Sequence, residues 1–107
     1  MAEFPTSVRI GYHDFTVEEW DVTAAAFASR YGECDHLKKT IRVSRAHGDR
    51  KAAETLVHET LHAIFNEWVI QKEDDEERIV STLSGAICAV WRQNPKAFEW
   101  IREQVTA

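Results

Sequence analysis

The run His58-Glu59-Thr60-Leu61-His62 carries two histidines and a glutamate at a spacing suited to metal-dependent hydrolysis. Residues four apart on a helix point the same way, so the imidazoles of His58 and His62 can reach one tetrahedral Zn²⁺. Glu59 projects about 60° around the helix from His62. There it can accept a proton from a water bound to the metal without becoming a ligand itself. The motif therefore predicts His58 and His62 as metal ligands, Glu59 as general base, and hydrolysis of an amide bond.

A catalytic zinc normally has a third protein ligand, and the sequence restricts where that ligand can lie. Phe65 and Trp68 occupy the positions at which an extended HExxHxxGxxH motif has glycine and histidine, and no histidine occurs later in the chain. The remaining downstream donors are the carboxylates of residues 73–77. On a helical wheel Glu76 lies near the centre of the apolar face, whereas Glu77 lies at its margin beside small residues that allow close helix packing. We expect Glu77 to be the third ligand, with Glu76 as the alternative; both also suit the N-terminal end of a helix.

The elements that must position these residues follow from apolar periodicity and turn residues. Trp20, Ala24, Phe27 and Tyr31 recur at helical spacing and predict a helix that packs through this face. The expected order is a strand at 7–12, a helix at 17–31, a hairpin at 32–44, a helix at 49–68 with Asp49 as N-cap, a helix that begins within 73–77, and a short helix at 96–105. This order predicts an α+β fold in which the zinc helix follows the hairpin.

Length, charge and cysteine content limit the classes of function. The 107 residues fit a single domain, residues 1–107, and the net charge of -5 argues against the usual kind of nucleic-acid binder. No apolar run approaches the roughly 18 residues of a membrane span, and no signal peptide is readable, so we expect a cytoplasmic protein. Cys34 and Cys88 are too few for a disulfide framework. We expect both to be small buried apolar side chains, the alternative being a thiol near a functional cleft.

Two stretches of the chain carry a resemblance to a known family. Residues 53–65, AETLVHETLHAIF, and residues 77–84, ERIVSTLS, resemble the minimal gluzincin-type metallopeptidases. They are most similar to the small HExxH proteins of phages and prophages related to the ImmA/IrrE type, and the likeness covers residues 31–95. The resemblance implies a zinc-dependent endopeptidase in which His58, His62 and Glu77 bind Zn²⁺ and Glu59 is the base. It also implies that a strand at 40–44 lines the cleft and holds an extended peptide or protein substrate by strand addition.

Other interpretations stay open at this point. A metal that ties two helices together would stabilise a small domain, so the chain is also compatible with a non-catalytic, zinc-stabilised binding module. A third interpretation is a regulatory protease that needs a partner for specificity. The group that would stabilise the oxyanion is not fixed either, because His36, His47, Tyr12 and Tyr31 are candidates by chemistry alone. The sequence leaves the oligomeric state undetermined.

Overall fold

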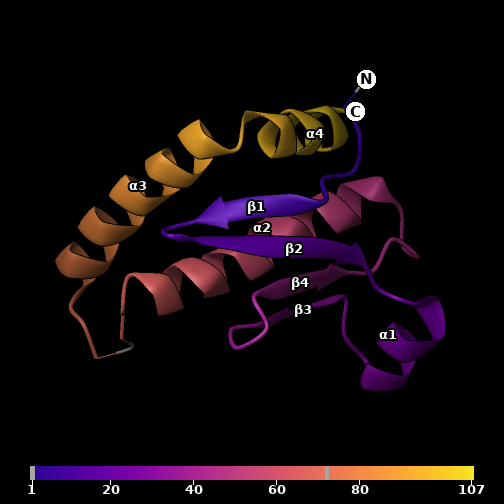
Figure 1. Cartoon of the computed structure of the whole chain (residues 1–107), viewed down its shortest axis with the longest axis horizontal. Coiled ribbons are helices and arrows are strands. Elements are labelled where there is room, and N and C mark those ends of the chain that lie inside the picture. The colour runs from indigo at the N-terminus through magenta and orange to yellow at the C-terminus, as the bar shows by residue number, and fades with distance from the viewer. Residues whose placement is uncertain (1, 72) are drawn as a thin grey trace.

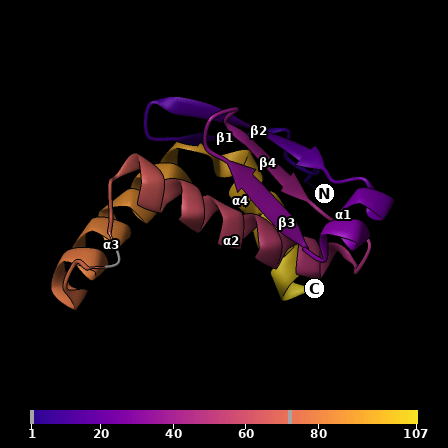
Figure 2. The same cartoon turned by 90° about the horizontal axis from the view of Figure 1, so that it is seen from below.

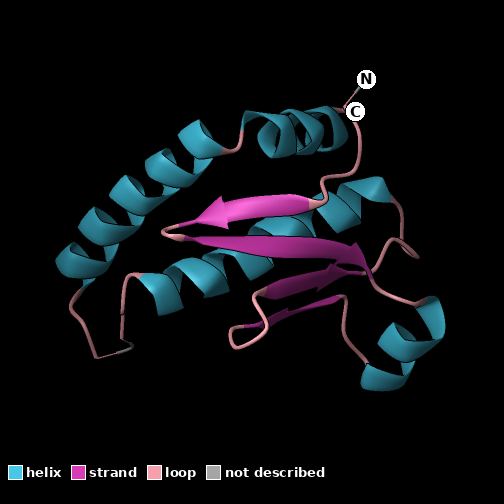
Figure 3. Ribbon diagram, viewed as in Figure 1, coloured by secondary structure: helices cyan, strands magenta, loops and turns pink. Residues whose placement is uncertain are grey.

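The structure is a computed structural model that describes residues 2–71 and 73–107. Over these residues the chain forms four strands and four helices, which confirms the predicted α+β class (Figures 1 and 3). In chain order they are β1 (Ser7–Ile10), β2 (His13–Glu19), α1 (Val22–Ala28), β3 (Gly32–Asp35), β4 (Thr40–Val43), α2 (Asp49–Glu67), α3 (Glu76–Gln93) and α4 (Pro95–Thr106). Among the residues described, none of the helices combines the length and the apolar character needed to cross a bilayer.

The strands form one sheet in the order β1-β2-β4-β3. β1 pairs with β2 and β3 pairs with β4 in antiparallel register, whereas β2 and β4 are parallel. The parallel pair needs a crossover connection, and α1 together with β3 supplies it. As a result β4 is central, with partners on both sides, and β1 and β3 are the two edges of the sheet.

One face of the sheet is apolar and packs against the helices, because successive side chains of a strand point to opposite faces. The buried face contributes the following core side chains, each at most 5% exposed: Val8, Ile10, Phe15, Val17, Ile41 and Val43. Figure 2 shows α2 lying along this side of the sheet. The opposite face carries ion pairs instead, with Arg42 bound to both Glu18 and Glu33. The apolar face of the sheet therefore fixes the position of α2.

The prediction of a helix at 17–31 is wrong at both ends of that range. β2 continues to Glu19, and α1 spans only Val22–Ala28, because the Asp21 side chain caps it by accepting from the backbone N–H of Ala24 at 3.0 Å. The predicted inward face does not exist either, since Phe27 is 92% exposed. The alternation of Phe15 and Val17 with polar neighbours was the sequence signal for the strand.

The remaining elements were predicted to within a few residues. The hairpin at 32–44 and the helices corresponding to α2, α3 and α4 are all present. Asp49 is the first residue of α2 rather than its N-cap, and its carboxylate binds Arg45 at 3.0 Å. α3 begins at Glu76, where Asp75 accepts from the backbone N–H of Arg78. Cys88 on α3 is exposed, so the expectation that it is buried is wrong.

Asn94, at the junction of α3 and α4, closes the β1 edge of the sheet. Its Oδ1 accepts from the backbone N–H of Arg9 at 2.7 Å, and its Nδ2 donates to the carbonyl oxygens of Arg9 at 2.8 Å and Val90 at 2.7 Å. The amide thus pairs with β1 as a neighbouring strand would. Because Asn94 is buried, the loss of these bonds would leave polar groups unsatisfied away from water.

Replacing Asn94 tests this closure. Asn94→Ala removes three hydrogen bonds, each contributing about 0.5–1.5 kcal/mol, so we expect urea unfolding to show a loss of about 2–4 kcal/mol. Hydrogen exchange at the Arg9 amide should also accelerate. Gln93→Ala, at the exposed neighbouring position, is the matched control and should change stability by no more than about 0.5 kcal/mol. Equal stability of the two variants would contradict the assigned role.

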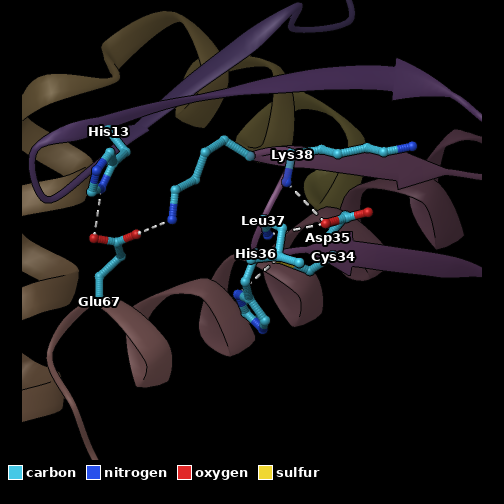
Figure 4. Close-up of polar contacts among 8 residues, drawn as sticks. His13, Cys34, Asp35, His36, Leu37, Lys38 and Glu67 are labelled. Atoms are coloured by element: carbon cyan, nitrogen blue, oxygen red, sulfur yellow. Dashed lines mark hydrogen bonds and ion pairs between the residues drawn. The ribbon is translucent and has the colours of Figure 1, made fainter.

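Glu67, at the end of α2, ties both hairpin turns to the helix (Figure 4). Its carboxylate accepts from His13 Nδ1 at 2.9 Å and from Lys39 Nζ at 3.2 Å, and its side chain is only 10% exposed. Burial alone would raise the pKa of Glu67, but the hydrogen bonds from His13 and Lys39 outweigh it and lower the pKa below the ordinary value of 4.5. The ionised carboxylate is therefore the form that stabilises the fold.

The stabilisation from Glu67 should depend on pH in a defined direction. Because its pKa is lowered on folding, the contribution is complete above pH 4.5 and is lost as the pH falls through the lowered pKa. We expect Glu67→Gln to reduce the free energy of unfolding by about 1–3 kcal/mol at neutral pH. The difference from the parent should shrink below pH 4.5. Glu18→Gln, on the exposed face of the sheet, is the control. If the difference in unfolding free energy between Glu67→Gln and the parent stays constant well below pH 4.5, the assignment is refuted.

Candidate metal centre

α2 places His58 and His62 side by side on its surface. Their Nε2 atoms are 3.2 Å apart, and their rings meet at an interplanar angle of 69°. Two nitrogen ligands of one tetrahedral Zn²⁺, each about 2.0–2.1 Å from the metal, lie about 3.3–3.4 Å from each other. The two imidazoles therefore already have the separation that a shared metal requires.

Glu59 projects from the same turn of α2 but is buried, with 7% of its surface exposed. Within residues 2–71 and 73–107, no side chain or backbone group forms a hydrogen bond or ion pair with its carboxylate. Burial raises the pKa of Glu59 above the ordinary glutamate value, while the nearby His62, His58 and Arg30 act in the opposite direction. An unpaired carboxylate with a raised pKa is a better proton acceptor than an ordinary glutamate.

A groove with a volume of about 850 Å³ runs between β3 and α2. His58, Glu59 and His62 line it from α2, and Cys34 and His36 line it from the β3 side. The strand predicted to line the cleft, at 40–44, does not do so, because β4 is hydrogen-bonded to strands on both sides. The free sheet edge at the groove belongs to β3.

Gly32 allows β3 to pack closely against α2 at one side of this groove. A Cβ atom built on Gly32 would lie 2.5 Å from Thr55 Cγ2 and 2.9 Å from the carbonyl oxygen of Arg42. Both distances are too short for any real side chain, and the second contact is with backbone that cannot rotate away. The first residue of β3 must therefore lack a side chain if the strand is to pack this closely on α2.

The register of β3 sends Cys34 to the α2 side of the sheet. Cys34 pairs with Ile41, which faces the core, whereas Glu33 pairs with Arg42 on the opposite face. Figure 4 shows the next residue of this alternation, His36, reaching toward α2, and Cys34 Sγ lies 3.8 Å from His36 Nδ1. Burial, together with the negative charges of Glu59 and Asp35, raises the pKa of Cys34 to about 11. The groove therefore contains a protonated, half-buried thiol, the alternative left open from the sequence.

The predicted carboxylate ligands lie apart from the two histidines. Glu77 and its alternative Glu76 are exposed in the first turn of α3, and Glu77 Oε1 accepts from Ser81 Oγ at 3.3 Å. In the part of the chain that the structure describes, no three His, Cys, Asp or Glu side chains are gathered closely enough to hold a metal. Figure 1 shows why, since α3 begins beyond the last turn of α2 and leads away from it toward β1. The role of Glu77 as a ligand stays a prediction.

The four candidates for oxyanion stabilisation fall into two groups. Tyr31 and His36 line the groove. Tyr12 is 91% exposed in the turn between β1 and β2, and His47 packs edge-on against Tyr31 at 5.1 Å between ring centroids. The position of the groove thus favours Tyr31 and His36 over the other two.

No protein-family model, curated protein or solved structure matches this chain significantly. The functional assignment therefore depends on the geometry of the site. Two imidazole nitrogens have the separation of shared metal ligands beside a carboxylate that lacks any partner among the described residues, but those residues bring no third donor close enough to complete the site.

Alanine substitutions at two glycines test the close approach of β3 to α2. Gly32→Ala forces its Cβ against Thr55 and the Arg42 carbonyl, and we expect overpacking to cost about 1–3 kcal/mol of unfolding free energy. Gly85→Ala is the control, since a Cβ atom added at this position of α3 would meet none of the described atoms within 4 Å. It should gain about 0.5–1 kcal/mol from improved helix propensity. If Gly32→Ala proves as stable as the parent in urea unfolding, the close contact does not constrain the groove.

Proposed function

We propose that this chain is a zinc-dependent peptidase that hydrolyses peptide bonds in the groove between β3 and α2. The observation that supports the proposal is the 3.2 Å separation of His58 Nε2 and His62 Nε2 beside the unpaired carboxylate of Glu59. His58 and His62 would hold Zn²⁺, with Glu77 as the expected third ligand. A bound Zn²⁺ polarises a carbonyl oxygen and lowers the pKa of water, which is the chemistry that amide hydrolysis needs.

Glu59 would handle the proton. Its carboxylate is free of hydrogen-bonding partners among the described residues and faces the groove, so it can take a proton from the attacking water. From its place in the groove wall it could then pass that proton to the leaving amine. The two histidines would not be available for this task, because both would serve as metal ligands.

The edge of β3 would hold the substrate. β3 pairs on one side only, with β4, so the backbone groups on its other side remain open to a further strand. An extended peptide that added to this edge would lie along the groove above Glu59. This arrangement places a peptide backbone, rather than a particular side chain, next to the catalytic residues, and it accounts for a peptide or protein as the substrate class.

A second candidate is a non-catalytic binding module stabilised by the metal, or a protease completed by a partner. The observation that favours it is that the described residues gather only two metal-binding donors with the right separation. Chelation separates the two candidates. A large fall in melting temperature without any loss of cleavage indicates a structural metal, whereas a folded but inactive metal-free protein indicates catalysis. In either case we place the chain in the cytoplasm, where Cys34 stays reduced.

Substitution of Glu59 provides the sharpest test of catalysis. Glu59→Gln keeps the size of the side chain and both histidines but removes the base. We expect it to bind one zinc per chain, measured by elemental analysis, and to cleave a fluorogenic peptide library at least about 100-fold more slowly. Glu54→Gln, also in the groove wall on α2, is the control and should retain the parent rate. A zinc-loaded parent that cleaves no library peptide would reject the peptidase assignment.

A further inference from the structure

Arg30 lies in the short connection between α1 and β3 and lines the groove where β3 begins. The backbone of this connection is held on both sides. The N–H of Arg30 donates to the carbonyl oxygen of Ala25 at 3.2 Å, which closes the end of α1, and the carbonyl oxygen of Tyr31 accepts from the N–H of Ser44 at 2.7 Å. The Arg30 side chain therefore extends from a defined point of the groove wall.

The guanidinium of Arg30 is exposed, and in the part of the chain that the structure describes it forms no hydrogen bond or ion pair. Other charged side chains of the groove wall are paired. Lys51 binds Glu54 at 3.7 Å, and Glu33 binds Arg42 at 3.1 Å. Of the two groove side chains that carry a permanent positive charge, Arg30 is thus the one that is available to a ligand.

Arg30 also lies close to the proposed base. A Cβ atom built on Gly32 would lie 3.3 Å from Glu59 Cγ, so the first residue of β3 is level with Glu59. Arg30 precedes Gly32 by two residues, which is at most about 7 Å along the chain. Its positive charge counteracts the rise that burial causes in the pKa of Glu59. A ligand bound to Arg30 would therefore belong to the same molecule that is hydrolysed beside Glu59.

The charges along β3 favour one direction for a bound peptide. Arg30 precedes the strand, whereas Asp35 is its last residue and accepts from the backbone N–H groups of Lys38 and Leu37 (Figure 4). The hydrogen bond from Lys38 lowers the pKa of Asp35, so its carboxylate is ionised at neutral pH. A peptide antiparallel to β3 runs with its carboxyl end toward Arg30 and its amino end toward Asp35, which brings opposite charges together at both ends.

We propose that Arg30 selects peptides that carry a carboxylate about two residues beyond the cleaved bond, on its carboxyl side. The inference rests on the proposed function and defines the substrate class of that groove. The carboxylate can belong to an aspartate or glutamate side chain or to a free C-terminus, since both have the same chemistry. The planar guanidinium binds either one through two parallel N–H groups.

Peptide binding measures this preference without any cleavage. Alanine-rich peptides with a fluorescent N-terminal label and an amidated C-terminus would carry one glutamate at successive positions, and fluorescence anisotropy on zinc-loaded Glu59→Gln protein gives each Kd. We expect glutamate at one position toward the carboxyl end to lower the Kd about tenfold relative to glutamine. Peptides with a free C-terminus and no glutamate distinguish the two sources. A gain in either set supports the proposal and assigns the carboxylate to a side chain or to the chain end.

Reversal of the charge at Arg30 should change the preference rather than abolish binding. In Arg30→Glu we expect the glutamate peptide to lose its advantage and the matching lysine peptide to gain one. Arg92→Glu, on the exposed surface of α3, makes the same change in net charge and is the matched control, which should keep the preference of the parent. The switch between ligands reports on the site itself, because a poorly folded variant would lose both.

Three results would overturn the role of Arg30. One is equal binding of glutamate, glutamine and lysine peptides together with no gain from a free C-terminus, and another is an unchanged preference in Arg30→Glu. The third is cleavage by the zinc-loaded parent, mapped by mass spectrometry, without any preference for a carboxylate beyond the cleaved bond; the proposed function would then stand. By contrast, a glutamate preference without cleavage of any peptide would support the carboxylate site and reject the peptidase assignment.

Discussion

The contact between Gly32 and α2 is the constraint from which the candidate site follows. The absence of a side chain at this one position allows the backbone of β3 to lie against Thr55 and Glu59. The strand then continues along the helix, and its alternation carries Cys34 and the nearby His36 over the turn that bears the HExxH motif. A groove formed in this way has one wall of rigid backbone and one wall of helix. Both the proposed chemistry and the proposed binding of an extended peptide depend on that pairing of walls.

The fold holds the α2 part of the candidate site firmly and the first turns of α3 less firmly. The sheet face, the core side chains of α2 and the carboxylate of Glu67 keep α2 in place, so the HExxH side chains are positioned before any ligand arrives. Such preorganisation is what makes a set of polar side chains effective in catalysis. The first turns of α3 are anchored less, because its buried residues, Ala86 and Val90, lie in its second half, toward β1 and α4 (Figure 1). If Glu77 at the start of α3 is a ligand, the metal itself would therefore have to impose part of the order of that helix.

Local patterns predicted the parts of the structure that depend on neighbours in sequence. The spacing of His58 and His62 was enough to place their nitrogens together, because a helix has a fixed repeat. The hairpin and the two C-terminal helices followed from alternation and from Pro95 in the same way. The strand that lines the groove could not be predicted, because the order β1-β2-β4-β3 depends on a parallel pairing between distant segments. The position of Cys34 depends on the same pairing, and the helix predicted at 17–31 failed because Trp20 and Phe27 fit a helical repeat while Phe15 and Val17 fit a strand.

Asn94 also determines when the sheet can be completed during synthesis. Its partner Arg9 lies 85 residues earlier in the chain, so the hairpin of β1 and β2 leaves the ribosome long before the residue that covers its outer edge. Until then β1 offers unpaired backbone donors and acceptors to any other strand, which is how aggregation begins. Closing so long a loop is also slow compared with forming the local hairpin. The nascent chain is thus exposed to misassembly at β1, at the edge of the sheet opposite to the groove, until the junction between α3 and α4 has emerged from the ribosome.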